Sequence, residues 1–255
     1  MDMGSLPKLW PGNEVFLRGV PSWSPNPKRK LADDEIHVWK CKLEVDHVER
    51  IRFWSSLSCE EKLRAVRFRR VVDRNRFVVT HGRLREILGF YAELAPYEIV
   101  LLSEQNGKPV LGSALRAKRV DFNITHSGDV ALFAFGRHRN IGIDVEKIEE
   151  GLGIQSIAET CLSISEQALL SNLSSKDRAT GFFNCWTRKE AYLKARGDGL
   201  RLALSGFDVT LAPGAPARFL AGVGPEWQIV AFYAESNFPA ALVYDGPVCK
   251  IRFLS

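Results

Sequence analysis

Several kinds of segment are missing from this chain of 255 residues. No apolar run approaches the ~18–20 residues of a membrane-spanning helix, so we expect no transmembrane segment. Prolines and charged residues interrupt the first residues where a signal peptide needs an apolar stretch, so we expect no secretory signal. The five cysteines are scattered, and none form a Cys-x-x-Cys pair. This favours reduced thiols in a cytoplasmic protein over disulfides or metal–thiolate chemistry.

The composition is that of an ordinary globular protein, with 45% hydrophobic and 25% charged residues and a net charge of +5. The positive charge is concentrated between Glu60 and Glu86, where nine Lys or Arg residues stand against four acids. A solvated helical face accounts for several of them. Aromatic residues are sparse there and no recognition motif is present, so we expect no nucleic-acid binding. An acidic partner protein or a polyphosphate ligand fits the same bias.

The order of elements predicts an α+β fold. Residues 1–34 contain five prolines and a Lys28-Arg29-Lys30 run, which indicates an extended N-terminal arm. We expect an N-terminal half over 35–140 and a C-terminal half over 141–255. In the first half we expect a strand at 36–45, helices from 58 to 89, a turn at 106–109 and two strands at 122–125 and 130–135. These two strands form an antiparallel meander with a third at 141–146, which begins the second half. In the second we expect helices at 165–173 and 180–196, followed by strands at 207–211, 227–233, 240–244 and 250–254.

Two carboxylates occur close together on one predicted strand, Ile141-Gly-Ile-Asp-Val-Glu-Lys147. Apolar residues alternate with Gly142, Asp144 and Glu146, so both acids share one face, roughly 6.5–7 Å apart. Like charges at this distance repel each other, which suggests a bound cation or a base supplied from elsewhere. Taken alone, an Asp-x-Glu pair on a strand is more often a solvated face.

A predicted helix ending near Gly197 carries a second acidic motif. Trp186, Glu190 and Lys194 follow i, i+4, i+8 spacing and project from one face. The carboxylate and the ammonium can therefore reach one ligand, the first through a metal and the second through a phosphate oxygen. Oxygen ligands with a nearby cation suit Mg²⁺ and a phosphorylated substrate. An ordinary i,i+4 ion pair is the alternative for Glu190 and Lys194 alone, and Trp186 alone is typical of a core residue.

The motifs Phe122-Asn-Ile-Thr-His-Ser-Gly128, Ile141-Gly-Ile-Asp-Val-Glu146 and Trp186-x-x-Lys-Glu-Ala-x-x-Lys194, in this order, resemble the Sfp-type 4′-phosphopantetheinyl transferases. The resemblance runs from about Leu57 to Val243. It implies a monomeric pseudo-dimer of two similar α+β halves, each with a small antiparallel sheet packed on helices. The active site then lies in the cleft between the halves, with Asp144 and Glu146 facing Glu190 across the boundary.

The same resemblance implies the reaction. The enzyme transfers the 4′-phosphopantetheine moiety of coenzyme A, its substrate, to a serine of an acidic apo acyl or peptidyl carrier protein and releases 3′,5′-ADP. Mg²⁺ is required, and Mn²⁺ can replace it. Carriers of fatty acid, polyketide and nonribosomal peptide synthesis all remain open. No membrane partner is implied.

The resemblance also assigns roles to residues. Asp144, Glu146 and Glu190 hold the metal. Glu190 and Lys194 are catalytic, the first by accepting the serine proton directly or through water and the second by stabilising charge on a phosphate oxygen. The expected coenzyme A contacts are Arg76, Lys108, Pro109, Thr125, His126, Asp144 and Lys194. Arg64 and Lys189 are left open between a ligand contact and a structural role.

Two other classes of function compete with this interpretation. The first is a coenzyme A or nucleotide-binding protein that has lost turnover, and the second is a metal-dependent phosphohydrolase with water as nucleophile. None of the carboxylates or the lysine of the motifs is missing, which favours the transferase.

Overall fold

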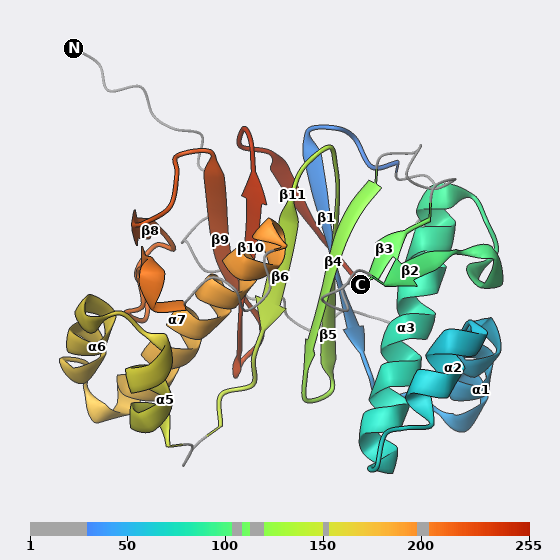
Figure 1. Cartoon of the computed structure of the whole chain (residues 1–255), viewed down its shortest axis with the longest axis horizontal. Helices are drawn as coiled ribbons and strands as arrows, with labels where there is room; N and C mark the ends of the chain where they lie inside the picture. Colours follow the sequence, from blue (N-terminus) through green and yellow to red (C-terminus); the bar gives the residue numbers. More distant parts are fainter. Residues whose placement is uncertain (1–29, 104–108, 113–119, 150–152, 198–203) are drawn as a thin grey trace.

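A computed structural model describes residues 30–103, 109–112, 120–149, 153–197 and 204–255. The chain folds as α+β, which confirms the expected fold class. Small sheets stand in the middle of the molecule and the helices lie outside them on both sides (Figure 1). The expected arm lies outside the described residues except for 30–34, as does most of the expected turn at 106–109.

The first sheet contains the first strand and the last strand of the chain. Its order is β11-β1-β5-β4, with β5 paired antiparallel to both β1 and β4 and β11 paired parallel to β1. The last strand therefore leaves the C-terminal part of the chain and completes the sheet of the N-terminal part. The bounds are Glu35–Lys42 for β1, Val120–Ser127 for β4, Val130–Arg137 for β5 and Lys250–Leu254 for β11.

The second sheet is antiparallel, with the order β6-β10-β9. The expected meander is wrong at its third strand, because β6 follows β5 along the chain but pairs with β10. The apolar face of β6, with Ile143 fully buried, packs in one core with Val38 and Leu132 of the first sheet. The bounds are Ile141–Val145 for β6, Trp227–Glu235 for β9 and Phe238–Asp245 for β10.

Three helices lie on the outer side of the first sheet and share one hydrophobic core with it (Figure 1). They are α1 (His47–Ser56), α2 (Cys59–Ala65) and α3 (Val71–Ala92). The capping box expected at Ser58 is confirmed, because its hydroxyl accepts from the Glu61 amide and the Glu61 carboxylate accepts from the Ser58 amide. We did not predict α1, whose start is marked only by the Asp46 cap.

The helices of the second half are α5 (Ile154–Cys161), α6 (Ile164–Ser171) and α7 (Ser175–Arg196). Helix α7 ends as predicted at Gly197, whose φ is +74°. It packs on β6 at very close range. A Cβ on Gly142 would lie 2.0 Å from the carbonyl oxygen of Ala191 and 2.3 Å from the amide nitrogen of Ala195. Only glycine therefore allows α7 to lie this close to the acidic strand.

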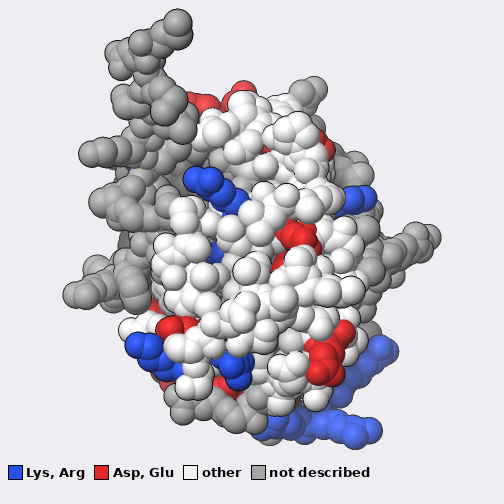
Figure 2. All heavy atoms as spheres, turned by 90° about the vertical axis from the view of Figure 1, so that its left-hand side faces the viewer, with Lys and Arg blue, Asp and Glu red and all other residues white. Residues whose placement is uncertain are grey.

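Short elements complete the described chain. They are β2 (Leu101–Ser103), which pairs with β3 (Pro109–Leu111), β7 (Asp208–Val209), which pairs with β8 (Phe219–Ala221), and 3₁₀ turns at Pro96–Glu98 and Leu204–Gly206. Among the described helices, none combines the length and apolarity needed to cross a bilayer. The face seen in Figure 2 is largely uncharged among its described residues.

Candidate active site

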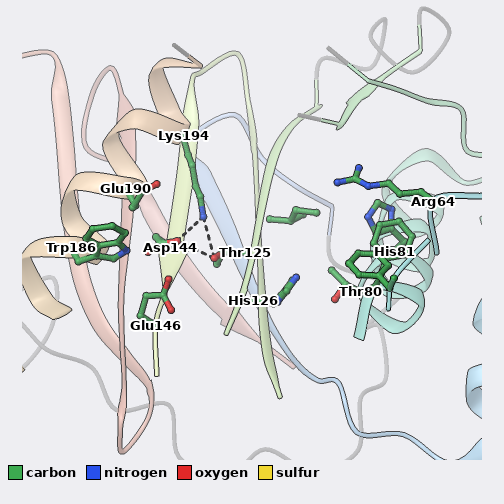
Figure 3. A pocket seen from close by; sticks show the side chains of 13 residues that line it. Arg64, Thr80, His81, Thr125, His126, Asp144, Glu146, Trp186, Glu190 and Lys194 are labelled. Atoms are coloured by element: carbon green, nitrogen blue, oxygen red, sulfur yellow. Dashed lines mark hydrogen bonds and ion pairs between the residues drawn. The ribbon is translucent and has the colours of Figure 1, made fainter. Parts of the chain in front are cut away.

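A cavity of roughly 530 Å³ opens between the two halves, a size typical of ligand pockets (Figure 3). One wall is formed by β6 and α7, the opposite wall by α2, α3 and the segment joining them, and β4 runs between the two. The lining residues are Arg64, Phe68, Phe77, Thr80, His81, Ile124, Thr125, His126, Asp144, Glu146, Trp186, Glu190 and Lys194.

The three predicted metal ligands, Asp144, Glu146 and Glu190, all line this cavity. They lie on one wall, because α7 packs on the sheet that contains β6. The expectation that Glu190 faces the other two across the boundary between the halves is therefore wrong. The α2–α3 segments face them instead, with a different chemistry.

Asp144 is the most buried of the three, at 3% exposed. Its Oδ1 accepts hydrogen bonds from Nζ of Lys194 at 2.6 Å and from the hydroxyl of Thr125 at 3.1 Å. Its Oδ2 is buried and, among the described residues, has no hydrogen-bond partner. Burial raises the pKa of Asp144, and the charge and hydrogen bonds of Lys194 oppose this rise.

The other two carboxylates experience the charge of Asp144. Burial, and then the charge of Asp144, raise the pKa of Glu146 to about 7, although Ser127 donates a hydrogen bond to its Oε2 at 2.8 Å. The same two causes raise the pKa of Glu190. The protein thus holds three acids where their negative charges repel one another, and a cation would relieve this repulsion.

The fit of these residues to a divalent metal is partial. In the described part of the chain, no three Asp, Glu, His or Cys side chains are already gathered closely enough to hold one ion. Asp144 is paired with Lys194 instead. The donors nevertheless suit Mg²⁺, since all are carboxylate oxygens and Oδ2 of Asp144 is buried without a partner among the described residues. The metal set therefore stays a prediction.

Alternate residues of β4 attach the two sheets to each other at this point. The side chain of Asn123 accepts from the Ile143 amide at 2.9 Å, Thr125 donates to Asp144, and Ser127 donates to Glu146. These three residues share one face of the strand. The spacing in Phe122-Asn-Ile-Thr-His-Ser-Gly128 is thus explained by hydrogen bonds that fix the acidic strand.

His126 and Lys194 provide hydrogen-bond donors near the middle of the cavity (Figure 3). His126 faces the cavity, yet the surrounding protein lowers its pKa by desolvation, and the charges of Lys194 and Arg76 lower it further. These effects favour the neutral form of His126, which can still donate a hydrogen bond from its ring. Arg76 acts on His126 in this way but does not itself line the cavity.

The wall opposite the acids presents Arg64 and His81. The guanidinium of Arg64 lies over the Phe77 ring, 5.4 Å from its centroid. The ring of His81 also stacks on Phe77, with 4.0 Å between the two ring centroids. The Nδ1 of His81 lies 2.9 Å from Oε1 of Glu61. The other carboxylate oxygen of Glu61, Oε2, accepts a hydrogen bond from Nε of Arg85 at 2.8 Å. This buried carboxylate fixes the ring of His81.

The cavity thus brings together most of the predicted site. It contains Thr125, His126, Asp144, Glu146, Glu190 and Lys194, together with Arg64 and Trp186. Lys108 lies outside the described residues, and of Pro109 only the backbone, in β3, is described. The lining residues not predicted are Phe68, Phe77, Thr80, His81 and Ile124. The spacing of 77, 80 and 81 on one helical face was the available signal, but it is also the spacing of core residues.

Comparisons with known proteins give matches that cover most of the chain. A family model described as the 4′-phosphopantetheinyl transferase superfamily matches residues 140–243, and one described as 4′-phosphopantetheinyl transferase, N-terminal, matches residues 46–137. The 4′-phosphopantetheinyl transferase HetI of Nostoc sp. strain PCC 7120 is 34% identical over 226 residues, which cover 88% of this chain and 94% of HetI.

Further relatives have narrower matches. The 4′-phosphopantetheinyl transferase Sfp of Bacillus subtilis strain 168 is 30% identical over 163 residues, which cover 64% of this chain and 70% of Sfp. A solved holo-(acyl-carrier-protein) synthase of Thermotoga maritima aligns with 42% of this chain and 62% of its own, at 23% identity and a TM-score of 0.33. On the strength of both family models and the nearly full-length match to HetI, the chain belongs to the 4′-phosphopantetheinyl transferase family.

Proposed function

We propose that this enzyme transfers the 4′-phosphopantetheine arm of coenzyme A to a serine hydroxyl of an apo acyl or peptidyl carrier protein. The observation that carries the proposal is that one cavity contains both acidic groups and hydrogen-bond donors, in different places. Carboxylates occupy one wall, and hydrogen-bond donors occupy the middle and the opposite wall. A substrate with a diphosphate needs both, since its oxygens bind donors and a divalent cation at once.

The donors bind and orient the phosphates. Lys194 acts as a point charge beside a diphosphate oxygen, and His126 donates a hydrogen bond from its ring. Arg64 and His81, fixed by Phe77 and Glu61, bind phosphate from the other wall. We also keep three further residues as proposed contacts of coenzyme A, at its adenine and 3′-phosphate end: Arg76, Lys108 and Pro109.

We further propose that Asp144, Glu146 and Glu190 hold one Mg²⁺, or Mn²⁺ in its place. When bound, such an ion neutralises charge on the diphosphate and on the leaving group. Thr125 and Ser127 serve this site by fixing the carboxylates of Asp144 and Glu146 through their hydroxyl hydrogen bonds.

In the reaction, the serine oxygen forms a bond to the β-phosphorus of coenzyme A, and the bond from that phosphorus to 3′,5′-ADP breaks. The serine proton passes to Glu190, directly or through a water molecule. A metal-bound carboxylate is a weak base, which favours the route through water. Most of the catalysis then consists of positioning and charge neutralisation.

We propose an acidic carrier, because exposed arginines follow Arg64 along the rim of the cavity. Arg67, Arg69 and Arg70 are all exposed and lie between α2 and α3. A negatively charged surface around the target serine would be attracted to this rim. We also propose that the enzyme acts as a monomer in the cytoplasm, since the site is built from one chain and the cysteines are free.

Incubation of the protein with coenzyme A, Mg²⁺ and an apo carrier tests the proposal. We expect the carrier to gain the mass of phosphopantetheine as 3′,5′-ADP appears. Release of 3′,5′-ADP without a carrier would instead identify a phosphohydrolase. Binding of coenzyme A with neither product would identify a binding protein.

A further inference from the structure

Lys189 immediately precedes Glu190, yet it does not reach the cavity. Its side chain is 1% exposed and is absent from the cavity lining. It points to the other side of α7, toward α6 and the segment 204–209. A buried lysine is costly unless all of its charge is compensated, so its partners show what it does.

All three hydrogens of the Lys189 ammonium have acceptors. Nζ lies 2.7 Å from Oε2 of Glu166, donates to the carbonyl oxygen of Leu204 at 2.6 Å and donates to the carbonyl oxygen of Phe207. It also lies 4.5 Å from the centroid of the Phe207 ring. The lysine therefore connects α7 to α6 and to the chain that returns after α7.

The carboxylate of Glu166 likewise has hydrogen-bond donors on both of its oxygens. Glu166 is fully buried, and its carboxylate accepts from the amides of Ser163 at 3.0 Å and Val209 at 2.9 Å in addition to Lys189. Because Glu166 is fixed by backbone groups of α6 and β7, it is a rigid anchor for Lys189. A flexible surface ion pair would not have this property.

Helix α7 is thus held on two sides at the level of the active site. On one side Gly142 lets the backbone at Ala191 and Ala195 pack directly on β6. On the other side Lys189 is tied to Glu166. Glu190 stands between these two contacts in sequence. Rotation or a shift of α7 would move Glu190 and Lys194 away from Asp144.

We propose that the buried pair Lys189–Glu166 positions α7 for catalysis, and that Lys189 is a positioning residue rather than a substrate contact. The inference rests on the proposed function, because it concerns the rate of phosphopantetheine transfer. A misplacement of about 1 Å at a reacting group can cost about 100-fold in rate. The donors His126 on β4, His81 on α3 and Arg64 on α2 lie outside α7, so most of the binding of the nucleotide should survive.

The test is the variant Lys189→Met, which keeps the length of the side chain and removes its charge. We expect kcat for carrier modification to fall at least about tenfold. The Kd for 3′,5′-ADP, measured by calorimetry without a carrier, should stay within about threefold. The matched control is Val38→Ala, a buried change in β1 outside the site, with both variants assayed well below their unfolding midpoints.

The double variant Glu166→Gln/Lys189→Met distinguishes an effect on the position of α7 from an effect on the stability of the fold. It also replaces the single variant if Lys189→Met does not fold. Removing both charges should restore part of the unfolding midpoint, since no buried charge is left uncompensated. If position matters, kcat remains low. Recovery of kcat together with the midpoint, or a kcat for Lys189→Met equal to that of Val38→Ala, would overturn the inference. Absence of transfer by the wild type would instead contradict the proposed function.

Discussion

The ammonium of Lys194 lies 2.6 Å from Oδ1 of Asp144, which joins α7 to β6 at the centre of the cavity. The two residues are opposite in charge and both belong to the proposed site. The pair compensates part of the charge of a buried carboxylate. It also places a phosphate-binding group directly beside a proposed metal ligand, as a diphosphate bound to a divalent ion requires.

The first prediction concerns this pair. Lys194→Met should lower kcat/KM for coenzyme A by about 10²–10³-fold, because it removes a donor aimed at developing charge. It should also raise the pKa of Asp144 further, since Lys194 opposes the effect of burial there. Steady-state transfer assays measure the first effect. Lys194→Arg, which keeps the charge, should retain more activity than Lys194→Met, and equal activity of the two variants would contradict the role.

The second prediction concerns the contact between α7 and β6. Gly142→Ala introduces a Cβ that would lie 2.0 Å from a backbone oxygen of α7, so the helix must move. We expect a loss of about 1–3 kcal/mol in the free energy of unfolding, as for other overpacked sites, together with reduced transfer. Denaturant unfolding measures the loss. Gly206→Ala is the control, since a Cβ there meets no atom within 4 Å.

The third prediction concerns the buried carboxylate that fixes His81. Burial alone raises the pKa of Glu61, but hydrogen bonds from His81, the Ser58 amide and Arg85 outweigh it and lower the pKa to about 2. The pKa in the folded protein is below the ordinary value of 4.5. The stabilisation is therefore complete above pH 4.5 and is lost as the pH falls toward 2.

Glu61→Gln should accordingly flatten the dependence of the free energy of unfolding on pH in this acid range. At pH 7 it should cost about 3–5 kcal/mol, because Arg85 keeps a buried charge without its partner. Urea unfolding at a series of pH values measures both effects. Glu60→Gln, at the exposed neighbouring position, is the control. An unchanged pH dependence in Glu61→Gln would refute this account of Glu61.

The fourth prediction concerns the carrier protein. Raising the ionic strength from about 0.1 to about 1 M shortens the Debye length from about 10 to about 3 Å. At saturating coenzyme A, KM for the carrier should rise severalfold, and Arg67→Ala/Arg69→Ala should reduce this salt dependence. Lys250→Ala, an exposed charge on β11, should not. A KM that does not respond to salt would remove the argument for an acidic carrier.

Much of the site could be predicted because its motifs are local. Asp144 and Glu146 are two residues apart on a strand, and Glu190 and Lys194 are four apart on a helix, so each pair shares a face whatever the tertiary structure. The α+β class and the end of α7 at Gly197 follow from similarly local signals. The pairing of β6 with β10 does not, because it joins segments almost 100 residues apart.

Of the wall formed by Arg64, Phe77 and His81, only Arg64 was considered as a ligand contact, for a related reason. Its residues are ordinary amphipathic helix positions, and only the packing of α2 against α3 brings Glu61 beside His81. Likewise, the burial of Lys189 depends on Glu166 and on backbone carbonyls after α7, and no spacing in the sequence indicates them. Contacts of this kind require the fold.

The most direct test of the account compares the wild type with Glu190→Gln by the intact mass of an apo carrier incubated with coenzyme A and Mg²⁺. Glu159→Gln, an exposed change on α5, is the control. We predict that the wild type and the control add one phosphopantetheine to each carrier, whereas Glu190→Gln adds almost none while still binding coenzyme A. Full modification by Glu190→Gln at the wild-type rate would contradict the central claim that the carboxylates of this cavity carry the reaction.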